Sequence, residues 1–289
     1  MLASFTQRLT VTLLKLLPAR SMGRIVYWLS RSERRWLKDL LINGFSKLYK
    51  VATHEAEKSV PQDYRSFNEF FSRKLKPAAR PIDQNPDSLV CPADGTIAQI
   101  GKAHEQDLLQ AKGKTFKAAD LLGDTNMAAA LSNCAFTTIY LAPYNYHRLH
   151  MPLDGKLEQT IFIPGLLYSV NAATTATIDN LYALNERLVC FFSSPYGPFA
   201  MTLVGAMNVA SISTAWGGEI KPTGSGNLIN TSYSGRDNAP TLSRGEYMGH
   251  FNMGSTIVLM APPGKCSWNT DTQNGNVVRM GQRLGSVRS

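Results

Sequence analysis

Apolar positions follow two different periods along this chain, with the change near residue 77. Within residues 1–50 apolar side chains recur every three or four positions, the spacing of one helical face. A first run extends from Leu2 to Leu17 and stops before Pro18. Ser32 is a candidate N-cap for a second helix. The apolar face of this second helix would comprise Trp36, Leu37, Leu40, Leu41, Phe45 and Leu48.

A short helix and an extended connection separate these helices from the rest. Ser66 and Glu69 have the spacing of a capping box, which predicts a helix continuing to Leu75. Four prolines then follow between positions 77 and 92. We therefore predict a helical membrane-associating region over residues 1–76 and a second domain over residues 77–289.

Alternating apolar runs dominate the second domain and predict β-strands. They cover residues 96–100, 135–142, 156–163, 188–192, 199–209, 211–216 and 256–260. Residues 114–122 are less regular and suggest a helix, and residues 170–182 suggest a loop that crosses a site. The pattern predicts an α+β protein with N-terminal helices and a mainly antiparallel β core.

Positive charge is concentrated at the N-terminus. The chain carries a net charge of +9, and residues 1–50 contribute +8 of it, with ten Lys or Arg against Glu33 and Asp39. These charges alternate with Leu, Ile, Val, Phe and Trp, which favours an anionic membrane surface over nucleic acid. Arg8, Lys15, Arg20 and Arg24 interrupt the apolar run, so we expect a helix lying on the bilayer, not crossing it. The alternative is that these helices pack on the core with a solvated basic face.

The four cysteines, Cys91, Cys134, Cys190 and Cys266, are widely spaced and match no zinc or redox motif. We interpret them as reduced packing residues of a cytoplasmic protein. We expect no metal, because the pair His147 and His150 has no third ligand pattern beside it.

Gly254, Ser255 and Thr256 stand directly before an apolar β-forming run. A glycine before a serine leaves its carbonyl open to attack by the serine hydroxyl. An N-to-O acyl shift followed by β-elimination would cleave the chain and leave a dehydroalanine at position 255. Hydrolysis of this dehydroalanine, with loss of ammonia, would convert it into a pyruvoyl group. The alternative is an ordinary turn entering a strand.

Two further segments contain candidate catalytic groups. Asp94 lies in a turn bounded by Pro92 and Gly95, and His147 and His150 flank Arg148. An aspartate, a histidine and a serine from distant segments can form a charge-relay triad. An Asp-Gly turn and a zinc ligand pair are the competing interpretations.

At this point the chain resembles the bacterial and mitochondrial phosphatidylserine decarboxylases, a family of pyruvoyl enzymes. The resemblance rests on several motifs in the family's order. They are FNEFFSR at 67–73, Arg80 with Pro81, PADG at 92–95, YHRLHMP at 146–152, IPGLLYSVN at 163–171, NER at 185–187, VGA at 204–206 and GST at 254–256.

The resemblance implies roles for individual residues. Asp94, His150 and Ser255 would form the self-processing triad, with His150 as the base, and His147 would face the pyruvoyl group as a protonated catalytic histidine. Cleavage between Gly254 and Ser255 would produce a large chain, 1–254, and a small chain, 255–289. Phosphatidylserine would then form a Schiff base with the pyruvoyl ketone and leave as phosphatidylethanolamine. A barrel-sandwich-hybrid core is also implied.

An apolar stretch that includes Phe162, Leu166, Leu167 and Tyr168 is our candidate for the substrate pocket, where it would desolvate the substrate carboxylate. Ordinary core or lipid-facing residues are the alternative. We expect as partners a phosphatidylserine-containing anionic membrane, the two chains of one precursor and a possible homodimer, with no nucleic acid. The expected location is peripheral, on the cytoplasmic face of the bacterial cell membrane.

Three other functions remain open on the residues alone. A serine hydrolase would use Ser255, His150 and Asp94, although Thr256 stands where such enzymes usually have glycine. A basic membrane-binding protein would have no catalytic activity. A pyruvoyl decarboxylase of a soluble amino acid would not need the amphipathic N-terminus.

Overall fold

The computed structural model describes residues 19–206, 211–220, 227–252 and 256–288. Helices come first along the chain and strands begin at Ser88, so the structure is α+β as predicted. The helical elements are α2 (Ala19–Ser30), α3 (Arg35–Tyr49), η1 (Thr53–Glu55), α4 (Phe67–Phe71), η2 (Pro77–Ala79), α5 (Ala118–Leu122), α6 (Thr125–Ala130), α7 (Ala172–Thr177) and α8 (Leu181–Leu184). The predicted helix within residues 2–17 lies outside the described residues.

The strands pair antiparallel throughout. They are β1 (Ser88–Val90), β2 (Gly95–Lys102), β3 (Asp107–Ala111), β4 (Lys114–Lys117), β5 (Ala135–Tyr140), β6 (Arg148–His150), β7 (Gly155–Ile163), β8 (Arg187–Ser193), β9 (Phe199–Val204), β10 (Ile212–Thr214), β11 (Gly218–Ile220), β12 (Ile229–Ser232), β13 (Thr241–Leu242), β14 (Tyr247–Phe251), β15 (Thr256–Met260), β16 (Cys266–Trp268), β17 (Val277–Val278) and β18 (Arg283–Val287).

The largest sheet contains nine of the described strands, in the order β12-β7-β8-β9-β15-β5-β2-β17 with β13 beside β7. Every residue of β15 is buried, because this strand lies between β9 and β5. A smaller sheet, β11-β10-β14-β6, carries the segment that leads toward residue 254. The described strands do not close into a barrel.

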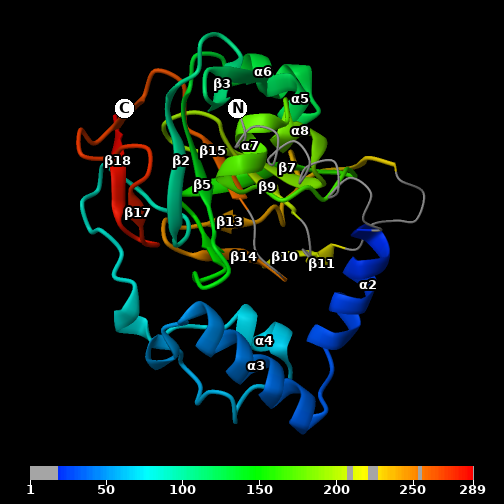
Figure 1. Cartoon of the computed structure of the whole chain (residues 1–289). Helices are drawn as coiled ribbons and strands as arrows, with labels where there is room; N and C mark the ends of the chain where they lie inside the picture. The colour runs from blue at the N-terminus through cyan, green and yellow to red at the C-terminus, as the bar shows by residue number, and fades with distance from the viewer. Residues whose placement is uncertain (1–18, 207–210, 221–226, 253–255, 289) are drawn as a thin grey trace.

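Helices occupy two separate places around the sheets. Figure 1 shows α3 and α4 together below β13 and β14, and α5 to α8 at the opposite end of the molecule. The lower helices have their own apolar cluster, which is built from Ile42, Val51, Tyr64, Phe67, Phe70 and Phe71. Cys91, Cys134 and Cys190 are buried, and all four cysteines are free thiols.

The boundaries of several helices and strands differ from the sequence prediction. Ser66 caps α4 by accepting from the Glu69 amide at 3.2 Å, but this helix ends at Phe71, not at Leu75. Ser32 is not the N-cap of α3, because that helix starts after Arg34. Residues 114–122 divide into β4 and α5, and residues 170–182 contain α7 and the start of α8 where a loop was expected. Asn171 explains α7, since its side chain caps two amides there.

Candidate active site

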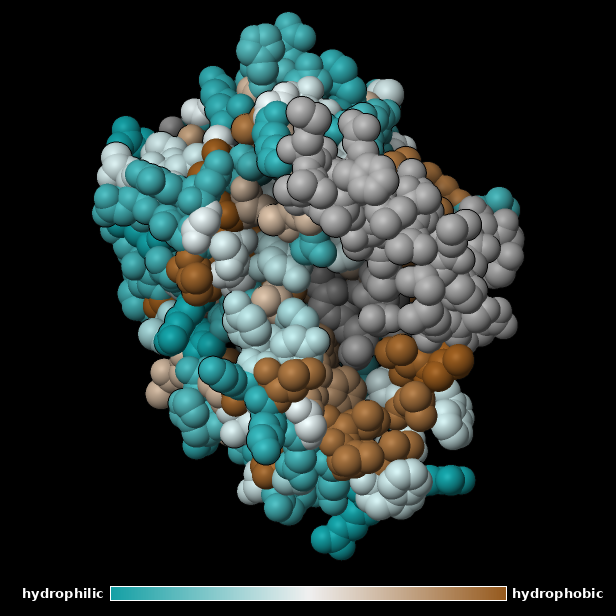
Figure 2. Space-filling view, viewed as in Figure 1, coloured by the Kyte–Doolittle hydropathy of each residue, from teal (hydrophilic) through white to brown (hydrophobic). Residues whose placement is uncertain are grey.

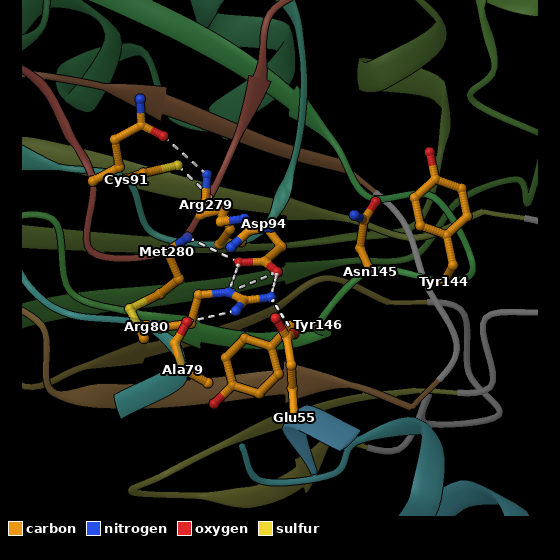
Figure 3. A network of polar contacts seen from close by, with 12 residues as sticks. Glu55, Ala79, Arg80, Cys91, Asp94, Tyr144, Asn145, Tyr146, Arg279 and Met280 are labelled. Carbon is orange, nitrogen blue, oxygen red and sulfur yellow. Dashed lines mark hydrogen bonds and ion pairs between the residues drawn. The ribbon is translucent and has the colours of Figure 1, made fainter. Parts of the chain in front are cut away.

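Asp94 lies in a buried ion-pair network at the start of β2. Its carboxylate accepts hydrogen bonds from Arg80 Nε at 2.8 Å and from the Met280 amide at 2.9 Å. Arg80 also pairs with Glu55 at 2.9 Å (Figure 3). Burial alone would lower the pKa of Arg80, but the hydrogen bonds to Asp94 and Glu55 raise it. The Asp94 carboxylate is therefore held in place by a guanidinium and a backbone amide.

His150 stands at the end of β6, with hydrogen-bond partners on both ring nitrogens. Nδ1 lies 2.9 Å from the Gly245 carbonyl, and Nε2 lies 3.1 Å from the Tyr146 hydroxyl. A carbonyl only accepts, so Nδ1 carries the hydrogen and the Nε2 lone pair accepts from Tyr146. Burial lowers the pKa of His150 below its usual 6.5. The ring is therefore neutral at pH 7, with the lone pair that a general base needs.

Asp94 influences His150 through its charge and not through direct contact. Among the described residues no hydrogen bond joins the two side chains. The Asp94 carboxylate accepts from Arg80 and the Met280 amide, and His150 Nδ1 is hydrogen-bonded to the Gly245 carbonyl. The Asp94 charge nevertheless acts to raise the pKa of His150, against the effect of burial. The His150 amide donates to the Pro92 carbonyl at 2.9 Å, which keeps the two segments adjacent.

His147 is fully buried and stacks on Phe71 of α4, with ring centroids 4.1 Å apart. Nε2 lies 3.3 Å from the Pro143 carbonyl, and Nδ1 has no hydrogen-bond partner among the described residues. Burial, and then the charge of Arg73, lower the pKa of His147 to about 3. The resting ring is thus neutral, and the protonated form expected from the sequence requires a change in its surroundings.

Gly254 and Ser255 lie outside the described residues, but the positions on either side are defined. Asn252 is 3% exposed and Thr256 is fully buried. Thr256 pairs with Tyr140 on β5 and with Val204 on β9. The Phe251 amide donates to the His147 carbonyl at 3.2 Å, so the segment before the predicted cleavage site runs beside His147.

The four predicted substrate residues separate into two environments. Phe162 is 3% exposed in the main core, whereas Leu166 is 46% exposed. Asn185 holds the Tyr168 backbone through two hydrogen bonds and also donates to the Gly205 carbonyl at 2.8 Å. Gly205 follows Val204, the partner of Thr256, so the loop containing Leu166 approaches the same end of β15.

Large apolar side chains are exposed on helices α2 and α3. They are Ile25, Trp28, Trp36, Leu40 and Leu48, each at least 60% exposed. Figure 2 shows hydrophobic atoms gathered at the lower right, where Figure 1 places α2. The predicted apolar face of the second helix is therefore divided: Leu41 and Phe45 pack against the buried cluster, while Trp36, Leu40 and Leu48 face outward. No described helix is both long and apolar enough to cross a membrane.

Sequence reasoning missed Gly245 and assigned no role to Tyr146, Arg73 or Arg80. Gly245 is the clearest signal in retrospect, because its φ of +79° favours glycine and a Cβ there would lie 2.2 Å from Ile82 Cδ1. The described residues contain no group of three His, Cys, Asp or Glu that could hold a metal ion.

Comparison with known proteins adds an independent finding. A family model described as phosphatidylserine decarboxylase matches residues 67–286, and a model described as PSD matches residues 9–50. Similar relatives carry the name phosphatidylserine decarboxylase proenzyme. The Methylococcus capsulatus protein is 42% identical over 99% of both chains, and the Alkalilimnicola ehrlichii protein is 46% identical over 89% of this chain and 90% of its own. The Ectopseudomonas mendocina protein is 41% identical over 98% of this chain and 99% of its own.

Proposed function

This chain belongs to the phosphatidylserine decarboxylase family, and we propose that it decarboxylates phosphatidylserine to phosphatidylethanolamine with a pyruvoyl group made from its own Ser255. The observation that carries this proposal is the state of His150: a partly buried, neutral imidazole whose Nε2 lone pair is available once Tyr146 moves aside. That is the form in which a histidine removes a proton from a serine hydroxyl.

Self-cleavage uses His150 as the base toward Ser255 Oγ, which attacks the Gly254 carbonyl. The Gly245 carbonyl fixes the tautomer through Nδ1. Asp94 supplies negative charge that stabilises the imidazolium formed during the attack. Arg80 keeps this carboxylate in place, since it donates through both Nε and Nη2.

The small chain, residues 255–289, would remain part of the fold after cleavage. Its first strand, β15, lies between β9 and β5, and β17 and β18 pair with β2 and β1. All four partner strands belong to the large chain. Separation would therefore require removing a central strand from the nine-stranded sheet.

The residues around Thr256 fit a pyruvoyl group at position 255. Thr256 is fixed by pairing on both sides. His147, whose carbonyl accepts from the Phe251 amide, has one ring nitrogen without a partner among the described residues. The pyruvoyl group would supply an electron sink for loss of the substrate carboxylate as carbon dioxide. His147 would return a proton to the substrate carbon. An anionic substrate near Arg73 would offset the charge that opposes protonation and so raise the pKa of His147.

Membrane contact follows from the exposed apolar residues of α2 and α3. Trp28, Trp36 and Leu40 would insert into the bilayer interface, where tryptophan is favoured. Arg34, Arg35, Lys47 and Lys50 are exposed and would contact anionic lipid. We place the enzyme on the cytoplasmic face of the bacterial cell membrane.

Mass spectrometry of the purified protein tests the proposal. We expect a 35-residue chain, 255–289, that binds a carbonyl reagent at its first residue, together with release of carbon dioxide from phosphatidylserine vesicles. Ser255→Ala should remain a single chain. An intact wild-type chain without a carbonyl group would contradict the proposal and favour a serine hydrolase or a binding protein.

Two further variants separate the histidine roles. His150→Ala should remain largely uncleaved, because the base is lost. His147→Ala should cleave but release no carbon dioxide. The opposite pair of phenotypes would reverse the assignment. Free serine as a substrate distinguishes a lipid decarboxylase from one acting on soluble amino acids, and we expect no turnover of it.

A further inference from the structure

Asn252 makes four hydrogen bonds at the point where the described chain approaches the predicted cleavage site. Its Nδ2 donates to Ser211 Oγ and to Ser213 Oγ, each at 2.8 Å, and its amide donates to the Ser211 carbonyl at 2.9 Å. Its Oδ1 accepts from Asn68 Nδ2 at 2.9 Å. The side chain is 3% exposed, so solvent does not compete with these bonds.

The same network reaches the helical region at two positions. Asn68 belongs to α4, which packs with α3. Ser211 Oγ donates to Glu219 on β11, and Glu219 accepts from Arg31 Nη2 at 2.7 Å. Arg31 directly follows α2. Helices α2 and α4 are therefore both joined through polar contacts to the residue two positions before Gly254.

The direction of each hydrogen bond explains why residue 252 is an asparagine. Ser211 has a single hydroxyl proton, which it gives to Glu219, so its lone pairs can only accept from Asn252. The group facing Ser211 must be the NH2 of Asn252, which leaves Oδ1 for Asn68. An aspartate at position 252 would place a second carboxylate against Ser211, beside Glu219. The Ser211 hydroxyl proton already goes to Glu219, so no proton would lie between Ser211 and the aspartate.

We propose that Asn252 is a positioning residue for self-cleavage, which anchors the segment before Gly254 to helices α2 and α4. The inference rests on the proposed function. The carbonyl that Ser255 Oγ must attack belongs to Gly254, two residues after Asn252. Thr256, two residues after Gly254, is held between β5 and β9. Fixing both flanks would keep the reacting groups close together, which is how positioning accelerates an intramolecular reaction.

The test measures the rate at which chain 1–254 appears during cell-free synthesis of the full-length protein. We expect Asn252→Ala to slow cleavage by roughly 10-fold to 100-fold, the range that a small misplacement of reacting groups costs. The matched control is Asn269→Ala, which removes one asparagine hydrogen bond to the carbonyl of Arg283, the first residue of β18. The control should cleave at the wild-type rate.

A second pair of variants separates positioning from a general loss of stability. Asn252→Asp should slow cleavage, because Ser211 gives its only hydroxyl proton to Glu219 and has none to donate to the new carboxylate. Adding Glu219→Gln should restore most of the rate, since the new amide can donate to Ser211 and free its proton for the aspartate. A structural defect alone would not be repaired by this exchange. Melting temperatures of all variants are measured in the Ser255→Ala background, where every protein is one chain.

The outcomes are distinct. Absence of cleavage in the wild-type chain contradicts the proposed function. Wild-type cleavage with an equally fast Asn252→Ala variant overturns the role of Asn252 and leaves the proposed function intact. If Asn252→Ala does not fold, the aspartate pair decides: slow cleavage restored by Glu219→Gln supports the inference, and unchanged or unrestored cleavage overturns it.

Discussion

His150 is held between a carbonyl that can only accept and a hydroxyl that can donate. This pair sets the tautomer of the ring, whereas burial lowers the pKa of His150 and keeps the ring neutral. The charge of Asp94 acts on His150, but the Asp94 carboxylate forms its ion pair with Arg80. At the scale of single residues, the site depends as much on Gly245, Tyr146 and Arg80 as on the groups that react.

Tyr146→Phe should shift the pH dependence of self-cleavage. A general base works only when deprotonated, so the wild-type rate should fall as pH falls through the His150 pKa, with its midpoint below pH 6.5. The Tyr146 hydroxyl donates to the Nε2 lone pair and favours the neutral ring. Its removal raises the pKa of His150, so the midpoint should move to higher pH. Tyr144→Phe, at an exposed tyrosine, should leave the profile unchanged.

Gly245→Ala should impair both stability and self-cleavage. Position 245 requires φ of +79°, and a Cβ there collides with Ile82. Gly235, with φ of +74° and nothing within 4 Å, provides the control. We expect Gly235→Ala to cost about 1 kcal/mol of unfolding free energy and to cleave normally. Gly245→Ala should cost about 3 kcal/mol and cleave slowly, as measured by denaturation and by gel. Equal effects at the two positions would contradict the role of the Gly245 carbonyl.

At the scale of elements, β14 and β15 matter because they belong to different sheets. β14 pairs with β6 and β10, so its first residue, Tyr247, lies opposite His150 and the amide of its last residue, Phe251, donates to the His147 carbonyl. β15 starts inside the large sheet. The loop after β7, which contains Leu166, is held by Asn185 next to Gly205. The proposed cleavage site falls in the chain between these two strands, outside the described residues.

Leu166→Asn tests whether this loop contributes to the substrate pocket. Leu166 is 46% exposed and a polar side chain there would bring water to the substrate carboxylate. We expect turnover of phosphatidylserine to fall by about tenfold, with self-cleavage unchanged. Leu109→Asn, on the β3–β4 hairpin with 37% exposure, is the control. Unchanged turnover in Leu166→Asn would reject the pocket role.

At the scale of the whole molecule, the helical region has two apolar surfaces with different partners. One surface joins the buried cluster that includes Phe71, the residue stacked on His147. The other presents Trp28, Trp36 and Leu40 outward. Through Arg31 and Asn68 the region also contacts the β10–β14 sheet. The proposed membrane contact and the candidate active site would therefore share one set of helices.

Trp36→Ala should weaken binding to vesicles that contain anionic lipid. Burying one large apolar side chain contributes about 2 kcal/mol, so losing Trp36 should reduce the partition coefficient roughly tenfold or more. Val277→Ala, at 73% exposure on β17, should have no effect. Sedimentation with vesicles measures both variants. Equal binding of wild type and Trp36→Ala would contradict insertion of this helix.

Sequence alone determined the helix and strand periods, the N-terminal charge and the chemical types at Asp94, His147, His150 and Ser255, because these are local properties of side chains and their spacing. The motifs also predicted the family, which the comparisons confirmed. Tertiary structure decided the partner of each polar group: Arg80 for Asp94, Gly245 for His150 and Phe71 against His147. These contacts join residues that are distant in the chain, and burial, which sets the charge of each histidine, exists only in the folded molecule.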